Sequence, residues 1–357
     1  MRCAAEFCWI DGPAALPDAA AALFADPGQG VEAVYDSLDW YRLLIAAARP
    51  EGAVPLFGLG CIDGRPALLL PAWRLAGGAL VSLTSPYSCA HRILLAPGLS
   101  EAELVSLGRA MAAALRGEDG LRLEGLPENW PPLAALLRGL LRGGMVPLGF
   151  AHFGNWHDSL PDCGWQAYLA SRSGKLRETI RRRTARIRRD PGFRFEMITG
   201  GDGLATGITA FETVYAQSWK NAEPFADFNA AFMRNAAGRG QLRLAVLWHG
   251  EIPVAVQYWL LAGGVAQVLK LAQNAAFDQH SPGTALTAWA IEQMIAQDAI
   301  AGLDFGRGDD GYKQLWVGQR AQRIGVMLAN PRRINGLATI LRHLAGWLRR
   351  HWRLDRR

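Results

Sequence analysis

The sequence is poor in cysteine. Its 357 residues include only Cys3, Cys8, Cys61, Cys89 and Cys163, and no two of these form a C-x-x-C pair. An odd number of widely spaced cysteines argues against a disulfide framework and against a zinc site. We therefore interpret them as reduced, mostly packing residues, and expect no metal cofactor.

Long hydrophobic runs are also missing. No stretch approaches the roughly 18 uncharged apolar residues that a membrane-spanning helix requires. The first nine residues contain Glu6 and lack the apolar core of a signal peptide. We expect a soluble, cytoplasmic protein.

The chain is long enough for two domains, and it repeats itself. Single hydrophobic cores stop growing at about 250 to 300 residues. Residues 73–78 read Trp-Arg-Leu-Ala-Gly-Gly, and residues 259–264 read Trp-Leu-Leu-Ala-Gly-Gly. The same order of strand, Gly-Gly turn, strand, loop, helix and strand surrounds both segments, which indicates an internal duplication. Chance likeness between two strand hairpins is the alternative, because hairpins share glycine and apolar residues.

Hydrophobic periodicity gives the elements of each copy. The second copy is predicted to have strands at 242–248, 252–261, 265–272 and 302–305, with a loop at 273–282 and a helix at 283–297. The first copy is predicted to have a helix at 101–115 and a strand at 121–124.

The net charge of +6 is concentrated in two segments. Residues 172–189 carry nine cations against the single acid Glu178, and the pattern predicts a helix with a thin apolar seam. This helix is either a solvated connector between the domains or a contact surface for an acidic ligand or tRNA.

The second basic segment covers residues 332–357. Its pattern predicts an amphipathic helix with one apolar stripe formed by Ile334, Leu337, Leu341, Leu344, Leu348 and Trp352. This stripe either packs against the second domain or binds peripherally to an anionic membrane surface.

The start of the helix in the second copy carries a candidate anion site. Pro282 suits the first helical position, Ser281 is a plausible N-cap, and Gly283 and Ala285 are small residues beside Thr284. Free backbone N–H groups and the helix dipole attract phosphate or pyrophosphate at such an end. An ordinary helix start is the alternative.

Together with this helix start, residues 303–316 carry a resemblance to a known family. They contain Asp-Phe, then Arg-Gly-Asp, then Tyr-Lys, then Trp. This segment resembles the branch of the GNAT superfamily that is related to the FemABX peptidyltransferases. The resemblance implies an α/β (α+β) fold of two tandem GNAT-like domains, each a mixed, mostly antiparallel sheet flanked by helices.

Domain boundaries follow from this resemblance and from the charge pattern. We expect a first GNAT-like domain at 1–160, a basic connecting helix at 161–195, a second, donor-binding GNAT-like domain at 196–330 and a basic amphipathic helix at 331–357.

The resemblance also implies a donor and a site. The donor is acetyl-CoA or another acyl-CoA, and its pyrophosphate is expected on Ser281, Pro282, Gly283, Thr284 and Ala285. Asp304, Asp309 and Lys313 are the candidate catalytic residues, because acyl transfer to an amine needs a proton acceptor and groups that hold the substrates. The candidate substrate-binding residues are Arg307, Gln257, Lys270 and Tyr312. The alternative for residues 304–316 is a polar turn held by internal salt bridges.

These observations favour an acyl-CoA-dependent N-acyltransferase. Its acceptor is expected to be a small molecule or a cell-envelope or polysaccharide precursor, modified on an amine of a sugar or an amino acid. Two alternatives remain: a peptidyltransferase that takes its donor from aminoacyl-tRNA, and a non-catalytic peripheral membrane or assembly factor.

Overall fold

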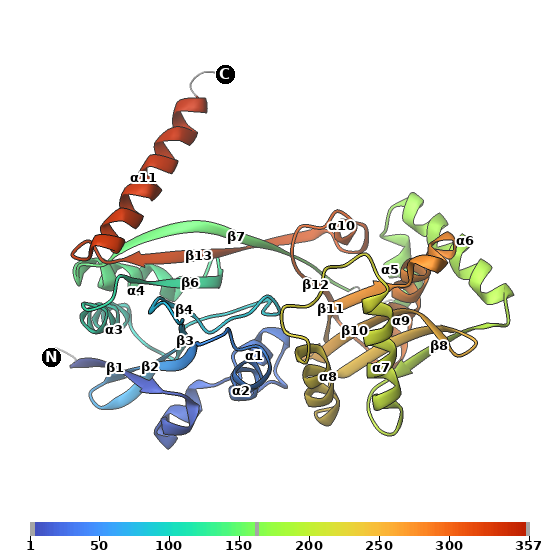
Figure 1. Ribbon diagram of the computed structural model, residues 1–357, viewed down its shortest axis with the longest axis horizontal. Coiled ribbons are helices and arrows are strands. Elements are labelled where there is room, and N and C mark those ends of the chain that lie inside the picture. Colours follow the sequence, from blue (N-terminus) through green and yellow to red (C-terminus); the bar gives the residue numbers. More distant parts are fainter. Residues whose placement is uncertain (1–3, 161–163, 355–357) are drawn as a thin grey trace. The chain divides into compact units, whose positions relative to one another are not determined.

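The chain folds into two compact units in the computed structural model, which describes residues 4–160 and 164–354, with side chains up to residue 346 (Figure 1). Unit 1 comprises Met1–Asp26, Tyr35–Phe153 and Gln322–Arg357, and unit 2 comprises Pro27–Val34 and Gly154–Ala321. Each unit combines a mixed sheet with helices, so the predicted α/β class with two tandem domains is confirmed. The predicted residue boundaries of the four regions stay predictions.

Unit 1 contains one end of the sheet. Its strands follow the order β1-β2-β3-β4-β6-β13-β7, and β5 pairs with β3. The strands are β1 (Ala5–Asp11), β2 (Val54–Ile62), β3 (Arg65–Arg74), β4 (Leu80–Ser82), β5 (Leu94–Leu95), β6 (Gly120–Pro127), β7 (Val146–Ser159) and β13 (Gln319–Ala329). The helices are the 3-10 helices η1 (Pro13–Ala15) and η2 (Asp18–Leu23), and α2 (Leu38–Ala47), α3 (Glu101–Ala114), α4 (Pro131–Arg142) and α11 (Ile334–Leu354). Strands β7 and β13 each run from one unit into the other.

Unit 2 contains the other strands, in the order β7-β12-β11-β10-β9-β8. These are β8 (Phe193–Ile198), β9 (Leu242–His249), β10 (Ile252–Ala262), β11 (Val265–Gln273) and β12 (Gly302–Arg307). The helices are α1 (Val31–Tyr35), α5 (Gly164–Ala170), α6 (Gly174–Arg189), α7 (Gly203–Ala216), α8 (Phe228–Gly238), the 3-10 helix η3 (Ala275–His280), α9 (Pro282–Asp298) and α10 (Lys313–Trp316).

The duplication inferred from the sequence appears as a shared topology. In unit 1, β3 and β4 are antiparallel, and α3 then leads to β6, which pairs parallel with β4. In unit 2, β10 and β11 are antiparallel, and α9 then leads to β12, which pairs parallel with β11. The repeated tryptophans Trp73 and Trp259 are both buried, at 1% and 0% exposure.

Local sequence explains how α3 begins in unit 1. Ser100 and Glu103 form a capping box, in which the Glu103 N–H donates to Ser100 Oγ and the Ser100 N–H donates to a Glu103 carboxylate oxygen. These bonds satisfy two of the amides that a helix start leaves unpaired. Helix α3 then packs against α4 at Gly108 and Gly139, where an added Cβ would lie 2.3 Å and 2.2 Å from backbone oxygens.

The basic helix predicted at 172–189 is α6, and its thin apolar seam is buried. Leu176, Ile180 and Ile187 belong to the core of unit 2, together with residues of α9 such as Leu286 and Ile291. Burying these side chains holds α6 to α9 and leaves the arginine-rich face exposed. Because α6 packs along α9, helix α6 also lies beside the candidate active site.

The C-terminal helix predicted at 332–357 is α11. Within the described residues, no helix is long and apolar enough to cross a membrane. The side chains of Leu348 and Trp352, which the sequence places on the apolar stripe, lie outside the described ones. Of the five cysteines, Cys8, Cys61 and Cys89 are free thiols, and Cys3 and Cys163 lie outside the described residues.

Candidate active site

A cavity forms where two parallel strands of unit 2 separate. Strands β11 and β12 pair at three positions, from Val265 opposite Gly302 to Gln267 opposite Asp304. Beyond these pairs β12 bends, because its register with β7 shifts between Asp304 and Arg307 and Gly306 has a positive φ of 64°. Strand β11 continues to Gln273, and the space beside its final residues is open.

This cavity has a volume of about 520 Å³. Its walls come from α6, α9, the end of β11, the loop after α7 and the segment that follows β12. The lining residues are Lys175, Leu176, Thr179, Trp219, Lys220, Leu271, Gln273, Gly283, Thr284, Thr287, Asp310, Tyr312, Leu315 and Trp316. Cationic, hydroxyl and aromatic side chains therefore surround the start of α9.

The start of α9 is built differently from the sequence prediction. Ser281 adopts a left-handed conformation (φ 50°, ψ 54°), and its side chain makes no capping hydrogen bond. Ser281 therefore occupies the predicted N-cap position, but its hydroxyl does not cap the helix. Instead, Gln273 at the end of β11 accepts a hydrogen bond from the Gly283 N–H at 3.0 Å. An added Cβ at Gly283 would lie 2.6 Å from that same oxygen, so the close approach of Gln273 requires glycine.

Helix α6 forms a basic wall of the cavity. Ser173 caps the helix by accepting the Leu176 N–H, and Lys175 and Thr179 line the cavity one turn apart. Further along, the guanidinium groups of Arg183 and Arg186 donate to the backbone oxygen of Gln279 at 3.0 and 3.3 Å. These two bonds tie α6 to the 3-10 helix immediately before α9.

A group of ionisable side chains from α7, β11 and the loop after α7 lies on one side of the cavity. Lys220 lines the cavity, with its Nζ 5.9 Å from the centroid of the Tyr215 ring. Lys270 lies 5.8 Å from the same centroid and forms a 2.6 Å ion pair with Glu223. Burial, reinforced by the like charge of Lys270, lowers the pKa of Lys220 to about 8. Lys220 was not predicted from the sequence, because its loop carries no recognisable motif.

Asp304 is enclosed within the sheet. Its carboxylate is 7% exposed and accepts hydrogen bonds from Asn155 Nδ2 at 3.1 Å and from the Gly306 N–H at 2.6 Å. Burial raises the pKa of this carboxyl, although the hydrogen bonds oppose that rise. The observed contacts hold the bend of β12.

Lys313 stabilises the turn that follows the bend. It is 3% exposed, and its ammonium donates to the backbone oxygens of Arg307 at 2.5 Å and Gly308 at 3.3 Å. The Lys313 Nζ also lies 3.5 Å from an Asp310 carboxylate oxygen. Three donors on one cation thus satisfy oxygens of a turn that has no regular pairing.

Asp309 points to a different set of partners. Arg320 Nε donates to it at 2.6 Å and Trp156 Nε1 donates at 3.1 Å. The hydrogen bond from Arg320 lowers the pKa of Asp309 to about 2, so this carboxyl is ionised near neutral pH. Part of segment 304–316 is therefore a polar turn, with one ion pair inside the segment, between Lys313 and Asp310, and another to Arg320 outside it.

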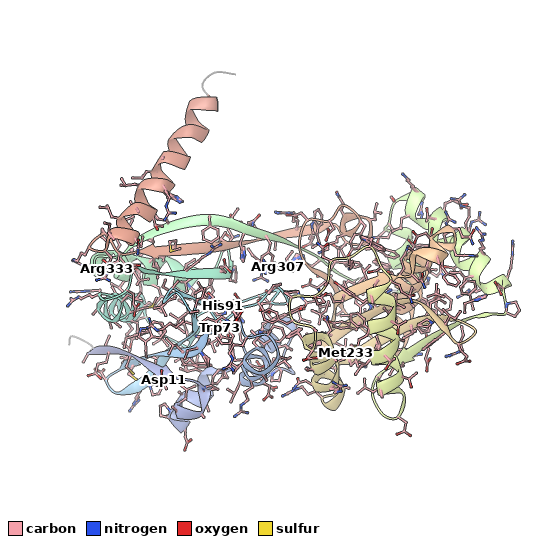
Figure 2. The ribbon with its side chains drawn as sticks, in the orientation of Figure 1. Asp11, Trp73, His91, Met233, Arg307 and Arg333 are labelled. Atoms are coloured by element: carbon pink, nitrogen blue, oxygen red, sulfur yellow. The ribbon has the colours of Figure 1, made fainter. Side chains whose placement is uncertain are left out.

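The remaining predicted residues divide between the cavity wall and the interior. Tyr312 lines the cavity at 38% exposure, and burial of its ring raises the pKa of its hydroxyl, which stays protonated. Gln257 is buried and donates to Thr287 Oγ1 at 3.2 Å. Arg307 ends β12 (Figure 2).

The structure thus brings Gly283, Thr284 and Tyr312 together at the cavity. Their roles, like those of the other predicted site residues, stay predictions. Within the described parts of the chain, no group of three or more His, Cys, Asp or Glu side chains is arranged to hold a metal ion.

Comparison with known proteins assigns this region to a family. Residues 174–314, from the start of α6 into α10, match the family model described as acetyltransferase (GNAT) domain. This region is therefore similar to GNAT acetyltransferase domains, which use acyl-CoA donors, and the similarity supports an acyltransferase. A search of curated proteins finds no match.

Solved structures extend the likeness to both units. The chain is similar to FemX, with 10% identity over 89% of this chain and 98% of that one, at a TM-score of 0.56. It is also similar to a tandem GNAT protein from the clavulanic acid biosynthesis pathway, with 12% identity over 92% and 99% of the chains and a TM-score of 0.53. It is similar as well to a conserved protein of unknown function from Bacteroides thetaiotaomicron, with 13% identity over 90% of this chain and 99% of that one, at a TM-score of 0.54. These likenesses confirm the FemABX-related, tandem GNAT-like fold.

Proposed function

We propose that the protein is an acyl-CoA-dependent N-acyltransferase whose donor site is the cavity of unit 2. The observation that supports this most directly is the position of that cavity, between the separating ends of β11 and β12 and against the start of α9. About 520 Å³ lies within the range of small-molecule binding sites.

The wall at the start of α9 fits the pyrophosphate of the donor. Gly283 and Thr284 belong to the first turn of a 17-residue helix, where the dipole favours negative charge. Lys175 adds a cationic side chain on the facing wall. Ser281, Pro282 and Ala285 shape the backbone of this first turn. The Ser281 and Ala285 N–H groups already donate to the backbone oxygens of Asp278 and Ser281, so the proposal assigns the Thr284 N–H to the phosphate. The donor supplies an activated thioester, which an amine can attack.

The rest of the cavity wall supplies groups that can assist attack by the acceptor amine. Such an amine must lose a proton as it attacks, so the reacting end needs a base close at hand. Lys220 and Asp310 line the cavity and can accept that proton, since the lowered pKa of Lys220 leaves part of its population neutral near pH 8. Tyr312, which stays protonated, can donate a hydrogen bond to an oxygen or sulfur that gains charge.

The acceptor in this proposal is a small molecule or a cell-envelope or polysaccharide precursor with an amine on a sugar or an amino acid. The buried aromatic and aliphatic floor formed by Leu176 and Trp316 suits the apolar part of an acyl chain or acceptor.

One observation favours a second candidate, transfer from aminoacyl-tRNA. The exposed face of α6 carries Arg177, Arg182 and Arg189, and the same helix lines the cavity through Lys175. A tRNA donor would use this face, and its binding would weaken steeply as salt rises.

Calorimetric titration with acetyl-CoA and with free CoA tests the first proposal. Thr284→Trp fills the cavity from the α9 start, and we expect it to weaken binding by about a hundredfold or more, roughly 2.7 kcal/mol. The control is Ala102→Trp, which adds the same side chain to the exposed first turn of α3 in unit 1 and should bind as the parent does.

Failure of the parent protein to bind either ligand would overturn the acyl-CoA proposal. Equal binding by Thr284→Trp would instead move the donor away from this cavity. Titration with tRNA at two salt concentrations separates the second candidate from the first.

A further inference from the structure

The first turn of helix α11 is bonded to the rest of unit 1. Asn335 Nδ2 donates to an Asp119 carboxylate oxygen at 2.7 Å, and Arg333, at the base of the helix (Figure 2), lies 3.6 Å from the same carboxylate. Gly336 is buried, and an added Cβ there would lie 2.1 Å from the backbone oxygen of Asn330. None of the residues 337–346 is buried, and the helix extends away from the strands of unit 1 (Figure 1).

An apolar stripe runs along the free part of this helix. Ile334 is 83% exposed, and the next three large apolar residues, Leu337, Leu341 and Leu344, are 45%, 57% and 48% exposed. Steps of three and four residues place all four on one face. Most of the stability of a helix in a protein comes from packing of its apolar face, so an exposed apolar stripe indicates a surface that covers it.

The positive charge beside the stripe indicates what kind of surface covers it. The sequence from Pro331 to Leu354 contains no Asp or Glu, whereas Arg332, Arg333 and Arg342 stand in its described part with exposed side chains. A guanidinium nitrogen of Arg342 lies within hydrogen-bond distance of Thr339 on the same helix, at 3.2 Å, so this cation has no acidic partner along α11.

A second copy of the helix would therefore bring arginines toward arginines. An anionic surface supplies the opposite charge and an apolar layer together. Since no described helix can cross a membrane, the fitting geometry is a helix lying in the interface.

We propose that α11 docks the protein on an anionic phospholipid surface, with Ile334, Leu337, Leu341 and Leu344 in the acyl-chain boundary and the flanking arginines at the phosphate groups. This surface lies in unit 1 and is independent of the proposed donor cavity, so each can be tested without the other.

Co-sedimentation of the full-length protein with vesicles tests the proposal. We expect binding to vesicles of phosphatidylglycerol and phosphatidylcholine, at least tenfold weaker binding to phosphatidylcholine alone, and release by salt. Leu341→Asp should reduce binding about tenfold or more, because it puts a charge into the apolar stripe. His343→Asp changes the charge similarly on the opposite face of the helix and should have a smaller effect.

Removing the charge while keeping the stripe gives the complementary test. Arg332→Gln combined with Arg342→Gln should weaken binding to the anionic vesicles and leave the weak binding to phosphatidylcholine unchanged. Absence of binding by the parent protein, or equal losses in Leu341→Asp and His343→Asp, would overturn the proposal. A dimer in light scattering that Leu341→Asp dissociates would assign the stripe to a second copy instead.

Discussion

Units 1 and 2 share a hairpin, a helix and a parallel strand, but the chain takes a different course after the hairpin of each. In unit 2, β11 runs on to Gln273 after its three pairs with β12, and the space beside it is the cavity. In unit 1, β4 ends at Ser82 after two pairs with β6. The chain then turns back, and β5 pairs with β3.

The space beside β6 in unit 1 is occupied by that returning chain. The His91 N–H donates to the backbone oxygen of Gly125 at 3.2 Å, and the His91 side chain is 1% exposed (Figure 2). Beyond the parallel pairs, the same topology is thus filled by the chain in unit 1 and stays open in unit 2. About ten residues after the hairpin decide whether this connection supports the fold or can receive a ligand.

The largest difference in stability between the two units is expected from a substitution of Lys313. The segment after β6 in unit 1 has no counterpart of this lysine. Lys313→Met removes the cation to which the partly buried oxygens of the turn after β12 are bonded. We expect a loss of about 3 kcal/mol in the free energy of unfolding of unit 2. Hydrogen exchange should quicken in β12 and α9 and stay unchanged in β6 and α3.

Lys175→Met is the matched control, because Lys175 is exposed on α6. It should change the free energy of unfolding by less than about 0.5 kcal/mol. An equal quickening of exchange in both units would contradict the assignment of Lys313 to unit 2 alone.

The next effect distinguishes the units by pH. Burial, followed by the charge of Arg92, lowers the pKa of His91 to about 3. The unfolded chain therefore binds a proton below about pH 6.5 that the folded chain refuses, and unit 1 loses stability as the pH falls. From pH 6.5 to 5 the loss approaches about 2 kcal/mol. Asp304 in unit 2 has a raised pKa. Its contribution to stability is therefore lost in the opposite direction, as the pH rises above the pKa that this carboxyl has in the unfolded chain.

Urea unfolding of the protein at several pH values measures this slope. In His91→Leu the acid loss should disappear, whereas in His249→Leu, which alters a half-exposed histidine of unit 2, it should persist. A slope that survives His91→Leu would remove His91 as its source.

The sequence predicted the regular elements around the cavity closely. Strands predicted at 242–248, 252–261 and 265–272 are β9, β10 and β11, and the helix predicted at 283–297 is α9, each within one residue at either end. These segments have strong periodicity and are separated by glycine turns, so local pattern suffices. The loop predicted between β11 and α9 contains the short helix η3.

The details of the site depend on contacts between elements, which local pattern does not contain. Gln273 caps α9 from a neighbouring strand, where the sequence had indicated Ser281. Lys220 reaches the cavity from a loop without a motif. The residue types of segment 304–316 were conspicuous, but their spacing did not show that Lys313 turns inward while Tyr312 lines the cavity.

The smallest effect on stability is expected at a backbone feature that the two units share. Gly125 in β6 and Gly306 in β12 both have a positive φ, 74° and 64°, and each is the fifth residue counted from the start of the parallel pairing. Alanine at either position should cost about 1 kcal/mol of unfolding free energy, because a Cβ disfavours the left-handed conformation. Only Gly306→Ala should also weaken acetyl-CoA binding in calorimetry, since the bend in β12 leads directly into the segment that lines the proposed donor cavity. Gly77→Ala, in an exposed turn with open space around it, is the control for both. Weaker acetyl-CoA binding in Gly125→Ala would mean that the closed crevice of unit 1 takes part in donor binding, and the functional contrast between the units would fail.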